Sequence, residues 1–310
     1  MIHLRLNESA LFSGPSGEVR LQRRLKDLVK HGERRVQIIV APQICDNALE
    51  QIAGTALQEP IEITLVLQRL PDDSILHAWK DRKFKLILPA PLLEKATSST
   101  LTLLSKNSQL CLWVPIPSPA TELNGMRRLM RDLKPLGGVE LGIGWETLGS
   151  GPRPRSTQNY REFAPLILDW IDDATALSIR TYFSCGLPLS MFGLEQLGHL
   201  ASRLVNWPIA RCGEDPVMDE NGGLHYCLLI GYQEPVMIDD ETALDGLNRL
   251  TEKRLGAIRS VTLADCRECR SLKTGACGGG CLAMELPFWQ GTSATQNLIL
   301  SPTLNAVASE

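Results

Sequence analysis

The chain has 310 residues, 44% of them hydrophobic, and a formal net charge of -3. This length and composition suit a globular protein with one large domain or two ordinary ones. The small net charge gives no overall attraction to nucleic acid or to an anionic membrane, so we expect neither as a partner. The first twenty residues lack the apolar core of a signal peptide, and no run reaches the roughly 18 apolar residues of a membrane span. We therefore expect a cytoplasmic protein.

The first predicted element is a helix that ends near Gly32. Leu21, Leu25 and Leu28 recur at helical spacing, and glycine is a typical helix stop. Basic residues accompany them at Arg20, Arg23, Arg24, Lys26, Lys30, Arg34 and Arg35. We interpret this basic stretch as the solvated face of a helix rather than as a binding surface.

From about residue 36 to 205, short apolar runs alternate with helical patterns. The predicted strands are 36–41, 61–67, 84–89, 110–114, 139–145 and 179–183. The predicted helices between and after them are 46–57, 72–80, 92–106, 122–133, 160–176 and 194–204. These six βα units predict an α/β fold with a parallel sheet covered by helices, either an open doubly wound sheet or a complete or partial barrel.

At residue 206 the helical pattern gives way to a turn-rich segment with many glycines and cysteines. We predict a domain boundary here, with one domain over 1–205 and a second over 206–310. One more amphipathic helix is expected between residues 244 and 255. Beyond about residue 290 the tail loses periodicity and is expected to be a loop.

Six of the nine cysteines follow residue 211, in closely spaced groups. They form Cys266-Arg-Glu-Cys269, Cys277-Gly-Gly-Gly-Cys281, and the pair Cys212 and Cys227, which brackets Gly222. Thiolates at such spacings can bind one metal ion or cluster, and glycines let the backbone curl around it. A tetrahedral zinc site from the last four cysteines is one interpretation. It does not account for Cys212 and Cys227, so iron-sulfur is favoured over zinc and over unligated thiols.

This cysteine pattern resembles the SPASM domain, which is attached to radical SAM enzymes that modify peptides and proteins. The agreement includes the Cys277-Gly-Gly-Gly-Cys281 ending and the nine residues, Gly222 and four residues that separate Cys212 from Cys227. The seven residues between Cys269 and Cys277 are more than the family usually has. The resemblance implies a partial (β/α)6 TIM-like barrel followed by a small, cysteine-rich SPASM-like domain.

The resemblance also implies the cofactors, which are one or two auxiliary [4Fe-4S] clusters. One cluster would take Cys212, Cys227 and Cys281, with Cys185 as a possible fourth ligand. The other would take Cys266, Cys269 and Cys277 and would be open at one iron, use Asp265 or another oxygen ligand, or be absent. His225 could be a second-shell donor, although an ordinary strand residue is the simpler interpretation.

The barrel departs from the family at the position of its catalytic cluster. Radical SAM enzymes carry three cysteines, spaced CxxxCxxC, in the loop after the first strand. The loop after the predicted strand 36–41 has only Cys45, and one thiolate cannot hold a [4Fe-4S] cluster. The Gly-Gly-Glu segment that the family places after its second strand is also missing at residues 68–72. We therefore expect no S-adenosylmethionine binding and no reductive cleavage of it.

The sequence thus predicts a catalytically degenerate radical SAM-like iron-sulfur protein. We expect a non-catalytic partner in peptide or protein modification that binds a radical SAM maturase or a substrate peptide. Two alternatives stay open, namely an enzyme that uses an open auxiliary cluster and a structural zinc protein whose barrel binds a ligand. We interpret Cys45 and Cys111 as small buried hydrophobes, and Arg153 and Arg155 as solvated loop residues.

Overall fold

The computed structural model describes most of the first 205 residues and short pieces beyond them. The described residues are 2–6, 15–79, 84–116, 123–137, 139–145, 157–183, 191–205, 217–218, 223–225, 236–237 and 270–274. None of the helices in these ranges is both long and apolar enough to cross a membrane.

The strands of the described ranges form one sheet, in the order β10-β9-β8-β1-β2-β3-β4-β5-β6-β7. Its parallel strands are β1 (Ile2–Leu6), β2 (Arg35–Val40), β3 (Glu62–Leu67), β4 (Phe84–Pro89), β5 (Ser108–Ile116), β6 (Glu140–Trp145) and β7 (Arg180–Phe183). The short strand β8 (Val217–Met218) pairs parallel to β1, and β9 (Gly223–His225) and β10 (Val236–Met237) continue antiparallel. Segments from both sides of residue 206 therefore belong to the same sheet.

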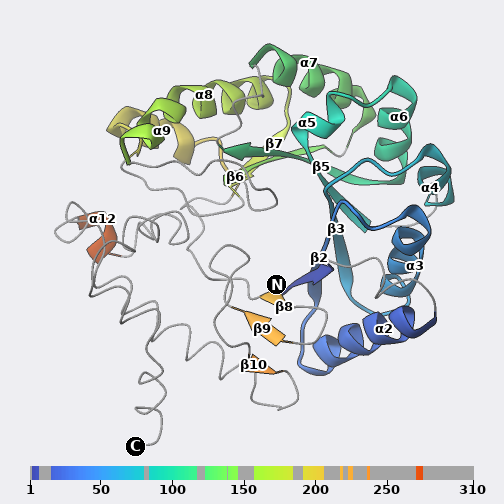
Figure 1. Cartoon of the computed structure of the whole chain (residues 1–310). Coiled ribbons are helices and arrows are strands. Elements are labelled where there is room, and N and C mark those ends of the chain that lie inside the picture. The colour runs from blue at the N-terminus through green and yellow to red at the C-terminus, as the bar shows by residue number, and fades with distance from the viewer. Residues whose placement is uncertain are drawn as a thin grey trace, which may run out of the picture.

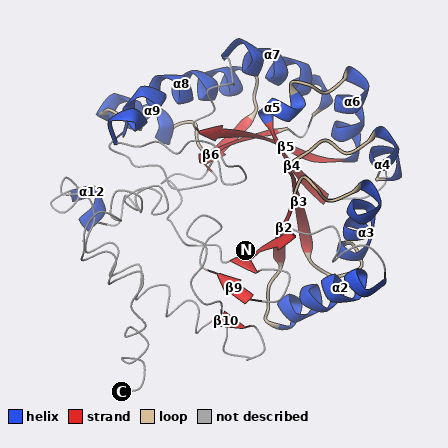
Figure 2. Ribbon diagram, viewed as in Figure 1, coloured by secondary structure: helices blue, strands red, loops and turns tan. Residues whose placement is uncertain are grey.

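Helices connect the parallel strands and lie on the outer side of the curved sheet (Figures 1 and 2). They are α2 (Pro15–Lys30), α3 (Asp46–Ala56), α4 (Asp73–Ala78), α5 (Ala90–Leu93), α6 (Ser98–Asn107), α7 (Leu123–Leu133), α8 (Thr157–Ala176) and α9 (Leu194–Ala201), with a 3-10 turn η1 (Lys134–Leu136) after α7. The short helix α12 (Arg270–Lys273) follows later in the chain and is not part of this layer. Parallel strands joined by crossover helices close partway into a barrel. The predicted partial barrel is confirmed.

The main hydrophobic core lies between the sheet and these outer helices. On β4, Phe84, Leu86 and Leu88 are buried in it, whereas the alternate residues Lys85 and Ile87 are on the inner face of the sheet. The edge of the Phe84 ring meets the Trp79 ring, with 5.1 Å between centroids. Because successive side chains of a strand alternate between faces, this core also fixes which residues reach the inner face.

All six predicted strands are present, but the structure adds β1 before them. The segment Ile2–Leu6 alternates apolar and polar residues, which is the pattern of a strand with one face in the core, and Leu4 is buried there. The prediction that the sheet begins at residue 36 is therefore wrong. The strand at 35–40 is the second parallel strand along the chain.

The helices predicted between residues 46 and 204 are also present, with one exception. The stretch 92–106 forms two helices, α5 and α6, because the chain turns at 94–97 and Thr97 caps the second one. The Thr97 hydroxyl oxygen accepts a hydrogen bond from the backbone N–H of Thr100, at 3.2 Å. The predicted helix at 244–255 and the tail beyond residue 290 lie outside the described residues.

The basic first helix forms as predicted. Leu21, Leu25 and Leu28 are buried against the core, and the chain leaves the helix through Gly32, whose φ of 83° is in the left-handed region that favours glycine. The backbone N–H of Gly32 donates to the carbonyl of Val29 at 3.0 Å.

Candidate functional site

The predicted cluster ligands lie outside the described residues. They are Cys185, Cys212, Cys227, Cys266, Cys269, Cys277 and Cys281, together with the alternative ligand Asp265. Arg153 and Arg155 lie outside them too, and the backbone of His225 is in β9. Within the described ranges, no three histidine, cysteine or acidic side chains lie close enough to bind a metal. The iron-sulfur and zinc sites stay predictions.

The two described thiols differ in their surroundings. Cys111 on β5 is fully buried, which confirms the interpretation as a small hydrophobe. Cys45 is exposed and occupies the N-cap of α3, so its interpretation as a buried residue is wrong. The turn at 41–44 lifts Cys45 away from the apolar strand that precedes it.

The structure adds a segment to those in which the family's cluster motif was sought. Residues 7–14, which follow β1, read Asn-Glu-Ser-Ala-Leu-Phe-Ser-Gly and contain no cysteine. The segment after the second strand, β2, reads Ala41-Pro-Gln-Ile-Cys45 and has one cysteine. Neither sequence contains the three cysteines of the motif.

At the carboxyl ends of β2 and β3, Arg69 ties together the segments that follow these strands. Its Nε and Nη2 donate to the carbonyl oxygen of Ile44 at 3.0 and 2.8 Å, and Nη1 donates to the carbonyl of Leu70 at 3.2 Å. Nη2 also forms an ion pair with the Asp46 carboxylate. We call this group of contacts the Arg69 latch. Because a guanidinium offers several N–H groups in one plane, a single side chain can hold both segments.

A second carboxyl group stands beside the latch. A hydrogen bond to Asp46 and the negative charge of that group raise the pKa of Asp72, and Arg69 acts in the opposite direction. Two carboxylates in contact repel each other, which makes the charged form of Asp72 less favourable. At the carboxyl ends of β2 and β3, which we call the mouth of the barrel, the guanidinium of Arg69 thus stands close to the carboxyl groups of Asp46 and Asp72.

On the inner face of the sheet, at the start of β6, the carboxylate of Glu140 forms ion pairs with two cationic side chains. Glu140 begins β6 and forms a hydrogen-bonded ion pair with Lys85 of β4, and the two side chains are only 10% and 22% exposed. Arg180 of β7 lies 3.6 Å away on the other carboxylate oxygen and is 66% exposed. A carboxylate buried to this degree needs such partners, because an unpaired buried charge is strongly destabilising.

Next to this ion pair, Cys111 and Tyr182 share a hydrogen bond. The Cys111 Sγ and the Tyr182 Oη are 2.8 Å apart, and Lys85 Nζ lies 5.3 Å from the centre of the tyrosine ring. Burial raises the pKa of the Cys111 thiol to about 11 and also raises the pKa of Tyr182. Both groups are therefore neutral near pH 7, and Cys111 is not an activated nucleophile. We call Lys85, Cys111, Glu140 and Tyr182 the inner-face cluster.

Gly142 makes room for this cluster on β6. A Cβ atom at this position would lie 3.2 Å from Cζ of Tyr182 and 3.3 Å from the Cys111 sulfur. The absence of a side chain lets the tyrosine ring reach across from β7 to β5.

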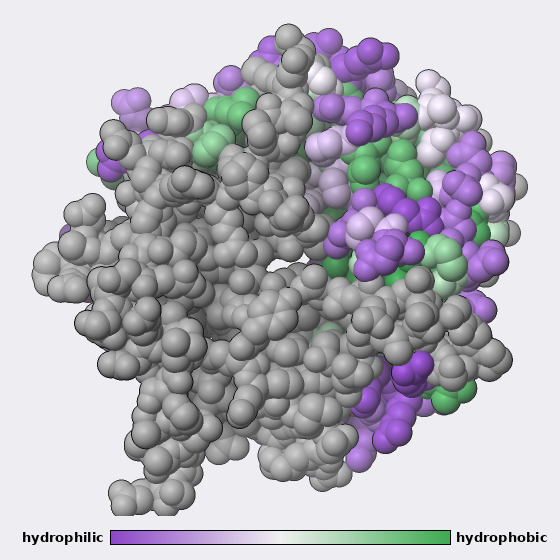
Figure 3. All heavy atoms as spheres, in the orientation of Figure 1, coloured by the Kyte–Doolittle hydropathy of each residue, from purple (hydrophilic) through white to green (hydrophobic). Residues whose placement is uncertain are grey.

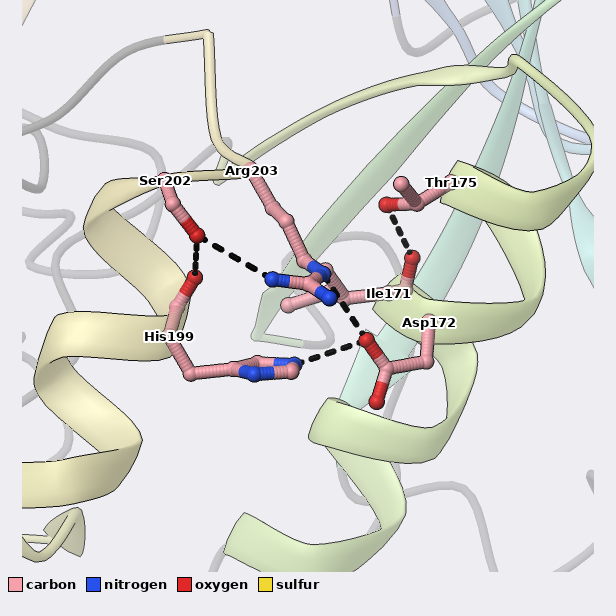
Figure 4. A network of polar contacts seen from close by, with 6 residues as sticks. All are labelled: Ile171, Asp172, Thr175, His199, Ser202 and Arg203. Carbon is pink, nitrogen blue, oxygen red and sulfur yellow. Dashed lines mark hydrogen bonds and ion pairs between the residues drawn. The ribbon is translucent and has the colours of Figure 1, made fainter.

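The chain leaves the barrel through a pinned segment after α9 (Figure 4). Asp172 of α8 contacts His199 Nε2 at 2.7 Å and Arg203 Nε at 2.9 Å. The contact between Arg203 and Asp172 is an ion pair rather than a hydrogen bond, because the Nε–H of Arg203 does not point at an acceptor in the described part of the chain. The backbone N–H of Val205 then donates to the carbonyl of Thr181 on β7, at 3.0 Å.

A curved parallel sheet with helices on its outer side defines a partial (β/α) barrel. Solved structures with this fold include SuiB from Streptococcus suis, at 12% identity and a TM-score of 0.55, with 90% of this chain and 71% of SuiB covered. SuiB bound to S-adenosylmethionine matches with a TM-score of 0.59 at 12% identity, covering 93% of this chain and 74% of SuiB. SuiB bound to its precursor peptide SuiA matches with a TM-score of 0.57 at 10% identity, covering 91% and 70%. No family model and no curated protein matches the sequence. The likeness is one of fold.

Proposed function

We propose that this protein is a radical SAM-like protein without a catalytic cluster that acts as a binding partner in peptide modification. Its barrel holds a peptide or a peptide-modifying enzyme, and its carboxy-terminal cysteines hold one or two iron-sulfur clusters. The observation that carries this proposal is the cysteine content of the segments that follow the first two parallel strands. Residues 7–14 after β1 have no cysteine, and residues 41–45 after β2 have only Cys45, whereas the family that the sequence resembles has three cluster ligands after its first strand.

The donor set of the first of these segments does not suit a [4Fe-4S] cluster. Such clusters are held by cysteine thiolates, whereas residues 7–14 offer only the oxygens of Asn7, Glu8, Ser9 and Ser13. Hydroxyl, amide and carboxylate oxygens suit hard ions such as Mg²⁺ and Ca²⁺.

The Arg69 latch is a second support for the loss of cleavage chemistry. In the family, the segment after the second strand holds the amine of S-adenosylmethionine. In this chain that segment runs from Ala41, and its Ile44 carbonyl and Asp46 carboxylate are taken by the guanidinium of Arg69. A cation built into the protein thus occupies acceptors that an amine would need.

A peptide partner is supported by the likeness to SuiB, which has been solved with its precursor peptide. For the carboxy-terminal domain, the support is the spacing of the six cysteines after residue 211. Clusters bound there would couple metal content to the folding of residues 206–285, so that chelation or oxidation unfolds this part first.

Metal analysis of the full chain, purified without oxygen, tests the cluster part of the proposal. We expect iron and acid-labile sulfide and little zinc. The matched variants are Cys266→Ala, which removes a predicted ligand, and Cys45→Ala, which removes an exposed thiol outside the predicted set. Iron should fall in the first and stay unchanged in the second. A colourless protein that contains zinc would instead support the structural zinc protein.

The same preparation tests the absence of catalysis. Incubated with S-adenosylmethionine and a strong reductant, it should consume no more than a protein-free reaction does. Consumption above that background would overturn the proposed degeneracy, whatever the metal content.

A further inference from the structure

From residue 19 onward, the surface of α2 and of the turn after it is rich in exposed positive charge. Between residues 19 and 35, every charged side chain that is exposed is a cation, and these are Arg20, Arg23, Lys26, Lys30, Arg34 and Arg35. The acids of this stretch, Asp27 and Glu33, are half-buried. Figure 3 shows hydrophilic surface in the region where Figure 1 places α2. The protein as a whole is weakly acidic, so this local excess of positive charge contrasts with the rest of the chain.

Three of these cations form a ridge along the helix. Arg23, Lys26 and Lys30 are spaced by three and four residues, which places them on neighbouring turns of one side of α2. With a rise of ~1.5 Å per residue, the ridge is roughly 10 Å long, the span of about three residues of an extended chain. Arg35 is left out of the ridge because it lies on β2, opposite Glu62 of β3 in the sheet register.

The surroundings of the ridge favour an acidic peptide over other polyanions. Residues 15–30 contain no aromatic side chain, and bases of single-stranded nucleic acid bind mainly by stacking on aromatic rings. The apolar residues Leu21, Leu25 and Leu28 are buried in the core, so α2 has no apolar face to insert into a membrane. The net charge of -3 disfavours the binding of a long polyanion, which would experience the charge of the whole protein. A short acidic segment experiences mainly the positive potential of the ridge itself.

We propose, in place of the interpretation of this basic stretch as a solvated face, that the ridge of Arg23, Lys26 and Lys30 binds an acidic segment of the peptide partner. This inference rests on the peptide-binding part of the proposed function and is independent of the cluster part. The peptide would lie on the outer side of the barrel, along α2, with its carboxylates paired to the ridge. Such contacts at an exposed surface contribute mainly to association rate and orientation, and salt weakens them.

Binding of a fluorescein-labelled octaglutamate peptide to the full chain, followed by fluorescence anisotropy, tests this inference. We compare the triple variant R23E/K26E/K30E with the triple variant R128E/R131E/K134E, which makes the same charge change on exposed residues of α7 and η1. The α2 variant should bind roughly tenfold more weakly or worse, and the α7 variant should change by less than about twofold. A milder variant, R23Q/K26Q/K30Q, covers the case in which charge reversal unfolds α2.

Equal weakening in both triple variants would mean that only net charge matters, and it would overturn the inference. So would no measurable binding of octaglutamate by the wild-type chain at low salt, or tighter binding of a single-stranded DNA of equal charge. Iron content and the consumption of S-adenosylmethionine should be unchanged in the α2 variant. A failure here therefore leaves the cluster part of the proposed function standing, and a failure of the metal analysis leaves this surface standing.

Discussion

On strands β2 and β3 the inner face carries Gln37, Ile39, Thr64 and Val66, whereas on β4 to β7 it carries the inner-face cluster. The first half is neutral at these positions, and its charged groups stand at the strand ends, with Arg35 and Glu62 at the amino ends and the Arg69 latch at the carboxyl ends. The second half places an ion pair, a thiol and a phenol side by side, all half-buried or buried. Because each buried polar group depends on its neighbour, this half should tolerate substitution poorly, while the latch should affect the mouth alone.

The largest effect should come from Glu140→Gln in the inner-face cluster. The variant leaves the ammonium of Lys85 half-buried without a carboxylate, which should cost about 2 to 3 kcal/mol of unfolding free energy. The matched control is Glu62→Gln on β3, an exposed position where we expect less than about 0.5 kcal/mol. Urea denaturation measures both, and equal losses would remove the distinction between the two halves.

The next largest effect should come from Gly142→Ala. Its Cβ would press against Tyr182 and Cys111, and overpacking of this kind should cost about 1 to 3 kcal/mol. Gly198→Ala, in α9, is the control because its Cβ would meet open space. There alanine should raise stability by up to about 1 kcal/mol. If both variants lost stability to the same degree, the crowding at Gly142 would not be its cause.

Removal of the latch by Arg69→Ala should act locally. It breaks three hydrogen bonds to the carbonyls of Ile44 and Leu70 and one ion pair, so amide hydrogen exchange should speed up in residues 43–46 and 70–73. Exchange on β5 and β6 should not change. Arg180→Ala, at an exposed position with a single ion pair of 3.6 Å in the described structure, should leave both regions as they are. Faster exchange throughout the sheet would show that the latch supports the whole barrel.

The smallest effect concerns pH. Burial raises the pKa of the Cys111 thiol from 9.0 to about 11, so the folded state holds its proton more tightly than the unfolded state does. The stability that this contributes is present below pH 9 and is lost as pH rises from 9 to 11. Between pH 8 and 10 the wild type should therefore lose about 1 kcal/mol more than Cys111→Ala. An identical pH dependence in the two proteins would contradict the burial of this thiol.

The parallel strands could be predicted because both sides of each are covered. Runs that are apolar except for one residue, such as Val36 to Val40 with Gln37 or Ile63 to Leu67 with Thr64, mark them without any knowledge of their neighbours. Ile2–Leu6 was missed because only alternate residues of that short segment are apolar. Without this strand, the parallel sheet was predicted to begin one strand too late along the chain.

The inner-face cluster and the Arg69 latch could not be predicted from the sequence. Lys85 and Glu140 are 55 residues apart, and their contact depends on the register of β4, β5 and β6 together. Arg69 and Asp46 meet only because β2 and β3 are neighbours in the sheet. The cysteines present the opposite case. Their spacing alone suggests a metal site, and the described structure neither adds to that prediction nor takes from it.

The hydrogen bond from Val205 to Thr181 gives the barrel a mechanical connection to whatever follows it. Thr181 and Tyr182 are adjacent on β7, and the tyrosine is hydrogen-bonded to Cys111 on β5. A force that pulls on the chain beyond residue 205 would therefore act directly on β7 at Thr181. The next residue is Tyr182, whose side chain crosses the inner face of the sheet to Cys111. Displacement of the cysteine-rich region and rearrangement inside the barrel would then be linked through β7, in addition to the pairing of β8 with β1.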